Sequence, residues 1–163
     1  MKKILLLVVL GLLGVQAYGA ILFSESGANE FLNELEHLSL SGQGAEYCDR
    51  LHDDMEVSID DRSADPPAVF EGGKQEFCDY VSYAAKGMDI IGVSTNVQRD
   101  DFTVKRSWLH PWTAEVSYVE SRTTTMSVIN TTLKTEGEDE WTLVNTFSGV
   151  KVMRLNSKTR LAQ

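Results

Sequence analysis

Two neighbouring aspartates, Asp60 and Asp61, are the residues of this sequence best suited to general-base chemistry. A carboxylate that removes a proton next to a carbonyl needs hydrogen-bond donors for the oxyanion that forms, normally a tyrosine and a protonated acid in an apolar site. The alternative is that Asp60, Asp61 and Asp65 are solvated loop acids, since two prolines follow them. The two interpretations differ in whether either carboxylate faces a closed cavity across from a Tyr or Trp donor.

A second candidate site follows from polar side chains that alternate along one predicted strand. Tyr118, Glu120 and Arg122 are spaced two residues apart, so they project to one face of that strand. Together with Asn145 they could place polar groups in an otherwise apolar cavity, which is the usual composition of a small-molecule site. The alternative is that Glu120 and Arg122 form an ion pair at the solvent-exposed wide end of the sheet.

Metal and cofactor chemistry is not indicated. The three histidines, His37, His52 and His110, are too scattered to suggest a catalytic pair. His52 lies among several acids, but their spacing matches no recognised set of metal ligands. The sequence has no phosphate-binding P-loop, no dinucleotide-binding glycine pattern, no Gly-x-Ser-x-Gly and no Cys/His nucleophile arrangement. We therefore expect no bound metal and no cofactor.

The N-terminus has the pattern of an export signal. Lys2 and Lys3 precede an unbroken apolar run over residues 4–15, and Ala17 and Gly19 are small residues spaced for cleavage after Gly19. We expect a signal peptide over residues 1–19 and a flexible mature N-terminus over residues 20–27, in a bacterial protein that is periplasmic or secreted. The alternative is a retained membrane anchor, because the apolar sequence continues to about the length that spans a bilayer, roughly 20 residues.

The charge balance excludes one class of partner. The chain has 15 Lys and Arg against 24 Asp and Glu, and loss of two lysines with the leader would give a formal charge of about −11. Nucleic acids and anionic lipid head groups require clustered Lys and Arg, which the sequence lacks. We expect no nucleic-acid partner, and membrane contact only if the leader is retained.

Three helices are predicted in the first half of the mature chain. Apolar residues recur at helical spacing over residues 28–40, with Ser26 as the N-cap. A short second helix is indicated by Ala45, Cys48 and Leu51, with Met55 as a further member. The third helix covers residues 74–86 and is expected to stop at Gly87. A short strand over residues 56–60 and a proline loop over residues 60–67 separate the last two helices.

The second half of the chain has the alternation of β-strands. We predict strands over residues 89–97 and 102–108, or one long strand bent at residues 98–101, followed by a tight corner over residues 109–112. Further strands follow over residues 114–122 and 126–135. An acidic turn around Gly137 then leads into a closing strand with four inward residues, Trp141, Leu143, Asn145 and Phe147. Segregated helices and strands give an α+β domain, with three N-terminal helices packed in a strongly curved, mainly antiparallel sheet.

Five aromatic residues outside the candidate sites are expected in the core or in an interface. They are Tyr47, Tyr80, Tyr83, Trp108 and Trp112.

Three passages, in this order, resemble the nuclear transport factor 2-like superfamily, which includes SnoaL-like cyclases and ketosteroid isomerase. Residues 51–61, followed by Phe70-Glu-Gly72, resemble its second helix, first strand and the glycine that opens the third helix. Residues 113–118 resemble its middle strand, and residues 139–144 with Ser148 resemble its closing strand. The resemblance implies a cystatin-like cone that encloses a pocket, over a domain of residues 28–150 followed by a C-terminal extension of residues 151–163.

The resemblance leaves two functions open. It implies that Asp60 or Asp61 stands where isomerase-type members place their carboxylate base. Those members also carry a tyrosine on the first helix, whereas this helix offers Phe31, Leu32 and His37. The leading interpretation is a domain without demonstrable catalysis that binds a small apolar ligand, or pairs with a protein partner or a second copy through its sheet face. The alternative is a SnoaL-like or ketosteroid isomerase-like enzyme, an isomerase, cyclase or lyase.

The only two cysteines, Cys48 and Cys78, fall on the buried stripes of helices that pack together in this superfamily. In an oxidising compartment they could form a disulfide that closes a loop of about 30 residues, which the chain-entropy model values at roughly 3 to 4 kcal/mol. The alternative is a pair of buried free thiols.

Overall fold

The computed structural model describes residues 23–63, 65–91 and 93–162, together with Gly14, Gly19 and Ile21, and only the backbone over residues 87–91. The expected signal peptide lies almost entirely outside the described residues. The described elements follow one another as α2 (Glu25–Leu40), α3 (Gly44–Asp49), β1 (Leu51–Arg62), β2 (Ala68–Gly73), α4 (Lys74–Ile91), β3 (Val93–Arg106), β4 (Thr113–Met126), β5 (Thr131–Thr146) and β6 (Gly149–Leu161).

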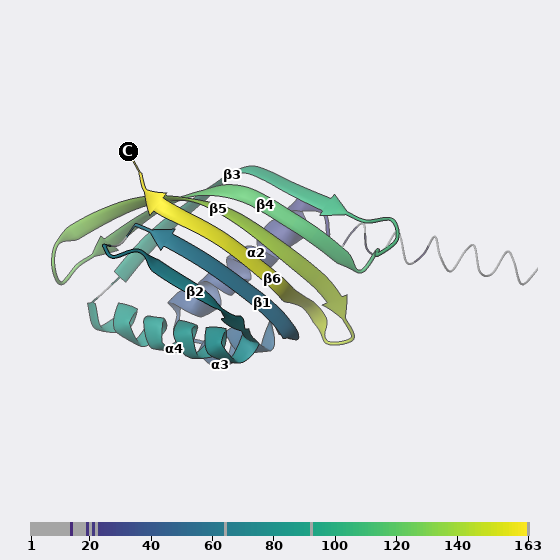
Figure 1. Ribbon diagram of the computed structural model, residues 1–163, viewed down its shortest axis with the longest axis horizontal. Helices are drawn as coiled ribbons and strands as arrows, with labels where there is room; N and C mark the ends of the chain where they lie inside the picture. Colours follow the sequence, from purple (N-terminus) through teal and green to yellow (C-terminus); the bar gives the residue numbers. More distant parts are fainter. Residues whose placement is uncertain are drawn as a thin grey trace, which may run out of the picture.

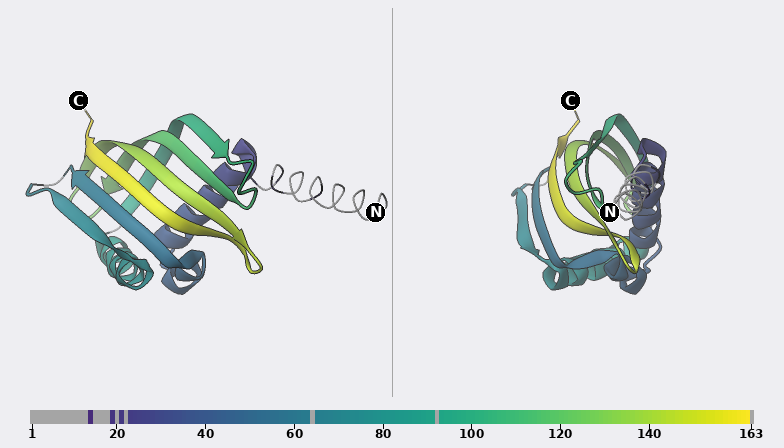
Figure 2. Two further views of the ribbon diagram at one scale, coloured as in Figure 1. Left: turned by 45° about the vertical axis from the view of Figure 1, so that its right-hand side comes forward. Right: turned by 90° about the vertical axis from the view of Figure 1, so that its right-hand side faces the viewer.

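The six strands form one curved sheet in the order β2-β1-β6-β5-β4-β3. All neighbouring strands are antiparallel except β1 and β6, which pair in parallel. Figure 1 shows α2, α3 and α4 on one side of the sheet, and the views in Figure 2 show the sheet curving around them. The fold predicted from the sequence, an α+β domain with three helices and a mainly antiparallel curved sheet, is confirmed.

Helix α2 packs its apolar stripe into the cone. Its buried residues recur every three or four positions and include Phe31, Leu32 and Leu35. The helix begins earlier than predicted, because Ser24 rather than Ser26 is the N-cap: the backbone N–H of Gly27 donates to Ser24 Oγ at 3.1 Å. None of the helices within the described residues is long and apolar enough to cross a membrane.

Strand β1 is longer than predicted at both ends. The expected second helix ends at Asp49, and Leu51 and Met55 belong to the strand, where their side chains are buried although Asp53 between them is exposed. At the other end the strand continues through Asp60 and Asp61 to Arg62, so these aspartates do not lie in a loop. The register with β6 shifts between Leu51 and Glu56, and this irregularity breaks the alternation that the sequence would otherwise show.

The C-terminal half also differs from the expected strand boundaries. The prediction of an acidic turn around Gly137 is wrong, because residues 131–146 form the single strand β5. The turn lies at Ser127–Asn130, where Asn130 has a φ of 49°. The segment after Gly149 forms β6, a central strand between β1 and β5. Of the four residues expected to point inward on the closing strand, Leu143 is fully buried, whereas Phe147 lies in the β5–β6 turn and is fully exposed.

Two further boundaries follow from local pairing. Strand β3 is one long strand with a register shift between Asp100 and Thr103, which agrees with the bent-strand alternative. Helix α4 runs past Gly87 to Ile91, so this glycine does not end it. A helix tolerates an interior glycine at a cost of about 1 kcal/mol when the flanking turns hold the conformation.

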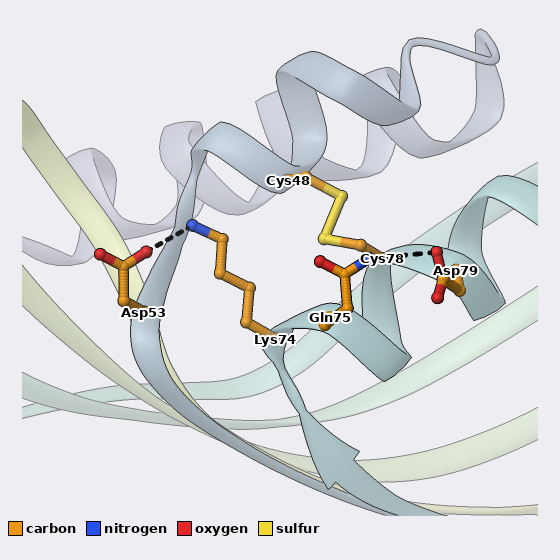
Figure 3. Close-up of a disulfide and its surroundings, with 6 residues drawn as sticks. All are labelled: Cys48, Asp53, Lys74, Gln75, Cys78 and Asp79. Atoms are coloured by element: carbon orange, nitrogen blue, oxygen red, sulfur yellow. Dashed lines mark hydrogen bonds and ion pairs between the residues drawn. A yellow bond between two sulfur atoms is a disulfide. The ribbon is translucent and has the colours of Figure 1, made fainter.

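A disulfide joins Cys48 of α3 to Cys78 of α4, and the Cα atoms of the two cysteines are 5.7 Å apart (Figure 3). The same junction is held by an ion pair of 2.8 Å between Lys74 and Asp53. Of the two alternatives for the cysteines, the structure shows the disulfide. This bond fixes the short helix α3 against α4 at one wall of the cone.

Candidate functional site

The inner face of the sheet is ordered in rows of side chains that change from apolar to polar. The pairing of β1, β6, β5, β4 and β3 aligns side chains of neighbouring strands in rows, because side chains at alternate positions share a face. The apolar row consists of Val57, Leu155, Trp141, Val116 and Val104. The next row contains Ile59, Ser157, Asp139 and Tyr118. The third row contains Asp61, Thr159, Gly137, Glu120 and Arg99.

A cavity of about 360 Å³ lies between these rows and the helices. This volume is near the lower end of the range typical of small-molecule sites, about 300–1,000 Å³. The sheet contributes polar groups to the cavity, and helices α3 and α4 contribute aromatic rings. The polar and charged side chains in the lining are Ser39, Asp61, Ser63, Glu120, Arg122, Thr124, Thr135, Asp139, Ser157 and Thr159. The aromatic lining residues are Tyr47, Phe77, Tyr80 and Trp141.

The two candidate aspartates point to opposite faces of β1, as neighbouring residues of a strand must. Asp61 lines the cavity, where its Oδ1 accepts a 2.8 Å hydrogen bond from the backbone N–H of Ser63. Asp60 instead borders a groove with Glu138 and Arg160 and pairs with Arg62 at 2.9 Å. Of the two aspartates, Asp61 is therefore the one that shares an enclosed space with Trp and Tyr side chains.

Tyr118, Glu120 and Arg122 lie together on the inner face, as their spacing predicts, but Asn145 does not join them. Glu120 is 8% exposed, and its Oε1 is 2.6 Å from a guanidinium nitrogen of Arg122. Arg122 is about half-exposed at the open side of the cavity, so the pair joins the buried and solvated parts of the site. Asn145 lies near the far end of β5, where its backbone N–H donates to the carbonyl oxygen of Trp112 at 2.8 Å.

Asp139 is the residue of the site that sequence reasoning missed, because it was assigned to a turn. Its side chain is 8% exposed. Burial raises the pKa of Asp139, and the nearby Glu120 carboxylate raises it further, while hydrogen bonds from Ser157 and Tyr118 oppose the increase. The signal was present in the sequence, since Asp139 continues the two-residue alternation of Trp141 and Leu143 backwards along the strand.

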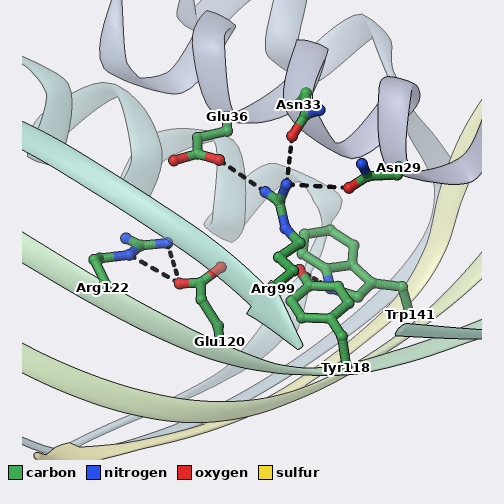
Figure 4. Close-up of polar contacts among 8 residues, drawn as sticks. All are labelled: Asn29, Asn33, Glu36, Arg99, Tyr118, Glu120, Arg122 and Trp141. Atoms are coloured by element: carbon green, nitrogen blue, oxygen red, sulfur yellow. Dashed lines mark hydrogen bonds and ion pairs between the residues drawn. The ribbon is translucent and has the colours of Figure 1, made fainter. Parts of the chain in front are cut away.

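Tyr118 connects the apolar row to the acids. Its hydroxyl oxygen accepts a 2.9 Å hydrogen bond from Trp141 Nε1 (Figure 4). Burial, together with the negative charges of Asp139 and Glu120, raises the pKa of the Tyr118 phenol, so this group stays protonated and can donate. The ring stacks on Phe102 with centroids 5.6 Å apart.

Arg99, also missed, ties this wall to helix α2. Its guanidinium pairs with Glu36 at 2.7 Å, donates to Asn33 and Asn29, and lies 5.3 Å from the centre of the Tyr118 ring (Figure 4). The residue falls within the predicted bend of β3, and only the strand register, which pairs it with Glu120, shows that it belongs to the site. Its ion-pair partner, Glu36, lies on α2 and is not one of the acids that line the cavity.

The helical wall of the cavity is aromatic. Phe77 is stacked on Tyr80 with ring centroids 6.2 Å apart, and it meets Tyr47 edge to face at 6.1 Å. Tyr47 is almost fully buried, and this burial raises the pKa of its phenol. Tyr47 and Tyr80 therefore line the cavity, although Tyr80 is half-exposed, whereas Tyr83, Trp108 and Trp112 do not line it and are at least half-exposed.

A metal site is not formed by the part of the chain that the structure describes, where no group of three or more His, Cys, Asp or Glu side chains is arranged to hold an ion. The acids around His52 are spread along β1, and Asp53 is engaged with Lys74.

Comparison with known proteins supports the fold. No protein-family model matches the sequence, and no curated protein matches it. A solved nuclear transport factor 2-like protein with a cystatin-like fold from Novosphingobium aromaticivorans is 15% identical over 90% of this chain and 87% of that chain, with a TM-score of 0.64. Aln2 from a Streptomyces species is 16% identical over 80% of this chain and 86% of that chain, with a TM-score of 0.61.

A third similar structure is the beta subunit of benzoate 1,2-dioxygenase from Burkholderia mallei. It is 11% identical over 86% of this chain and 91% of that chain, with a TM-score of 0.65. Identities this low show the fold alone. The chain thus has the cone fold of the nuclear transport factor 2-like proteins, and the resemblance of its three sequence passages is confirmed at that level.

Proposed function

We propose that the protein binds a small organic molecule in the cone cavity, and that this ligand has an apolar or aromatic body and a basic, positively charged group. The observation that carries the proposal is the charge of the cavity wall. Three carboxylates, Asp61, Glu120 and Asp139, line the cavity against one cation among the described lining residues, Arg122, which pairs with Glu120 and also acts on Asp139.

The aromatic wall fits the same ligand. An ammonium group is attracted to the faces of Tyr and Trp rings, and the apolar row around Trp141 offers a surface for the ligand body. A cation near Asp139 would also stabilise its ionised form, which burial disfavours. This ligand class refines the small apolar molecule expected from the sequence by adding a charged end.

Three compounds of nearly equal size test the proposal: 2-phenylethylamine, 2-phenylethanol and phenylacetate carry a positive, a neutral and a negative end on the same body. We expect calorimetric titration to give the tightest binding for the amine, by about tenfold over the alcohol, which corresponds to one good charge-assisted hydrogen bond. Phenylacetate should bind least. Equal binding of the amine and the alcohol would refute the charged end while leaving the cavity as a site.

Neighbouring residues of β4 provide a matched pair of variants for the site itself. Thr124 lines the cavity, whereas Thr123 points to the other face of the strand. We expect Thr124→Trp to weaken binding of all three compounds and Thr123→Trp to leave it unchanged. If Thr124→Trp binds them as well as the unmodified protein does, the cavity is not the site.

A second function is favoured by the position of Asp61, which faces the cavity that also contains Trp141 and Tyr47. We propose that Asp61, rather than Asp60, would be the base if the protein catalyses proton abstraction next to a carbonyl. Asp139, whose pKa burial raises, would then donate a hydrogen bond to the oxyanion.

Deuterium exchange into cyclohexanone, followed by NMR in D₂O, tests this catalysis directly. We expect Asp61→Asn to abolish any exchange above the buffer rate and Asp60→Asn to retain it. Exchange at the buffer rate with the unmodified protein would reject the enzyme interpretation and leave ligand binding in place.

The disulfide fits an extracellular location, where such bonds persist. We propose that the chain is exported with its leader cleaved near Gly19, as the sequence predicts. N-terminal sequencing of the exported protein that found Met1 retained would overturn this.

A further inference from the structure

Four large apolar side chains project from two adjacent turns at one end of the cone. Trp108, Leu109 and Trp112 belong to the β3–β4 turn and are 75%, 77% and 50% exposed, and Phe147 in the β5–β6 turn is fully exposed. The hydrogen bond from the Asn145 backbone N–H to Trp112 joins the two turns, and Figure 1 shows both at the same end of the sheet. We name these four residues the aromatic corner.

The exposure of the aromatic corner is built into the turn. The N–H of His110 donates to the carbonyl oxygen of Ser107 at 3.3 Å, and the N–H and the hydroxyl of Thr113 donate to the carbonyl oxygen of His110 at 3.1 and 3.0 Å. The N–H of Leu109 donates to Ser107 Oγ at 3.2 Å. These bonds fix the backbone that carries the side chains outward, and exposed apolar residues gathered in this way mark an interaction surface.

The N-terminal segment reaches the domain at this same corner. The backbone of Gly19 lies so close to Pro111 that a Cβ at position 19 would collide with the Pro111 carbonyl oxygen. The carbonyl oxygen of Gly19 accepts a 3.0 Å hydrogen bond from the N–H of Phe23, two residues before α2 begins. Gly19, which follows the apolar run of residues 4–15 in the sequence, therefore lies beside the aromatic corner.

We propose that the aromatic corner docks into the interface of a zwitterionic lipid bilayer. Tryptophan rings prefer the head-group level of a membrane, where the ring is buried and the N–H stays hydrated, and Leu109 and Phe147 supply side chains for the deeper layer. The four residues project from the tips of turns, which suits insertion into a fluid surface better than contact with a flat protein surface. The acidic chain, at a formal charge of −9, makes an anionic membrane the poorer partner.

This docking differs from the membrane contact expected from the sequence, which depends on the retained leader alone. The aromatic corner adds a folded surface that fixes the orientation of the domain, with the end that carries the two turns toward the lipid. The contact is also independent of the cavity, because none of the cavity-lining residues belongs to the corner.

The test uses the full chain and the chain that begins at Ala20, which is the cleaved form proposed above, each with phosphatidylcholine vesicles and hydrogen–deuterium exchange read by mass spectrometry. We expect slower exchange in residues 107–113 and 146–149 when vesicles are added. The β4–β5 turn is the internal control: Val128 and Ile129 are also apolar and exposed, at 69% and 59%, but this turn lies at the opposite end of the sheet (Figure 1). Exchange in residues 127–130 should not change.

Paired variants separate the aromatic corner from the leader. We expect Leu109→Ser with Phe147→Ser to weaken vesicle co-sedimentation about tenfold or more, since each side chain loses part of its transfer into the interface. Val128→Ser with Ile129→Ser should bind as the unmodified chain does. Equal binding of both variants, without protection of the two turns, would show that the leader alone holds the membrane and would overturn the proposal. Protection without vesicles that grows with protein concentration would overturn it in favour of a second copy.

Discussion

Asp139 shows how a single residue can shape both the stability and the ligand preference of this protein. An acid whose pKa is higher in the folded than in the unfolded chain binds more protons when folded, so its contribution to stability is greatest at low pH. That contribution is lost as the pH rises from about 4, the unfolded value, through the folded pKa. Since burial raises the pKa of Asp139, the ionised carboxylate opposes folding at neutral pH.

We therefore expect Asp139→Asn to unfold at a higher temperature than the unmodified protein at pH 7, because the amide is neutral and its oxygen can still accept hydrogen bonds. The gain should shrink as the pH falls to about 3, below the unfolded value of about 4, because Asp139 then becomes protonated in both states. Calorimetry at the two pH values measures the difference. Glu138→Gln, at an exposed neighbouring position on the other face of β5, is the control that should change little. A gain that is the same at both pH values would contradict the assigned pKa shift.

The disulfide between Cys48 and Cys78 is a second feature at the residue scale with a measurable consequence. Cys48 and Cys78 are 30 residues apart, and the chain-entropy model assigns a loop of this length roughly 3 to 4 kcal/mol. We expect the double variant Cys48→Ala with Cys78→Ala to lose about this free energy of unfolding in urea. Addition of a reductant should lower the stability of the unmodified protein by a similar amount and leave the double variant unchanged. A reductant effect on both proteins would point to a cause other than this bond.

At the level of elements, helix α2 is attached to the sheet edge by one arginine. Arg99 is only 11% exposed in its side chain and pairs with Glu36, which is 22% exposed. Removal of one partner of such a pair leaves a nearly buried charge uncompensated, and this typically costs about 3 to 5 kcal/mol. We expect Arg99→Met to lose about 3 kcal/mol in urea unfolding. Combining it with Glu36→Leu should recover part of this loss. If the double variant instead loses as much free energy of unfolding as the two single variants together, the two residues act independently.

Strand β6 provides a second test at this level, because within the described part of the chain it is the strand that joins β1 to the rest of the sheet. We expect a chain ending at Gly149 to lose cooperative unfolding, since no strand then joins the paired β1 and β2 to β3, β4 and β5. A chain ending at Leu161 is the control and should melt as the full chain does. Circular dichroism during heating reads both, and a cooperative transition in the shorter chain would contradict the central role of β6.

The elements show what the sequence could predict and where it failed. The helices and the inner face of β4 could be predicted from the sequence, because apolar residues such as Phe31 and Leu35 repeat at helical spacing and Tyr118, Glu120 and Arg122 alternate. The length of β1 could not be predicted, because a register shift interrupts its alternation. Gly137 was assigned to a turn because glycine among acids is typical of turns, whereas its partners Glu120 and Thr159 hold it inside the sheet. Arg99 required knowledge of strand register, which local spacing does not contain.

At the scale of the whole molecule, charge and apolar surface are separated. The face of the sheet opposite the cavity carries ion pairs between Glu56 and Arg154 and between Glu136 and Arg160, at 2.9 and 3.7 Å. A homodimer through the sheet, which remains a prediction from the sequence, would therefore have a polar, ion-paired interface if it uses this face. The aromatic corner and the acidic cavity lie apart from that face, so the two proposed contacts can be tested by their different responses to salt.

Binding of a cation in the cavity should depend on salt, because the net charge of −9 attracts cations. Dissolved ions screen this attraction, and the screening length is about 10 Å at 0.1 M. We expect the dissociation constant of 2-phenylethylamine to rise about two- to fivefold between 20 and 500 mM NaCl, through loss of this long-range attraction. The constant for 2-phenylethanol should not rise, since the neutral compound gains nothing from the field. Binding of the aromatic corner to phosphatidylcholine depends on apolar transfer and should keep its strength over the same range. A parallel loss of amine and vesicle binding would mean that salt acts on the fold itself, because only a common structural cause would weaken two contacts of such different chemistry.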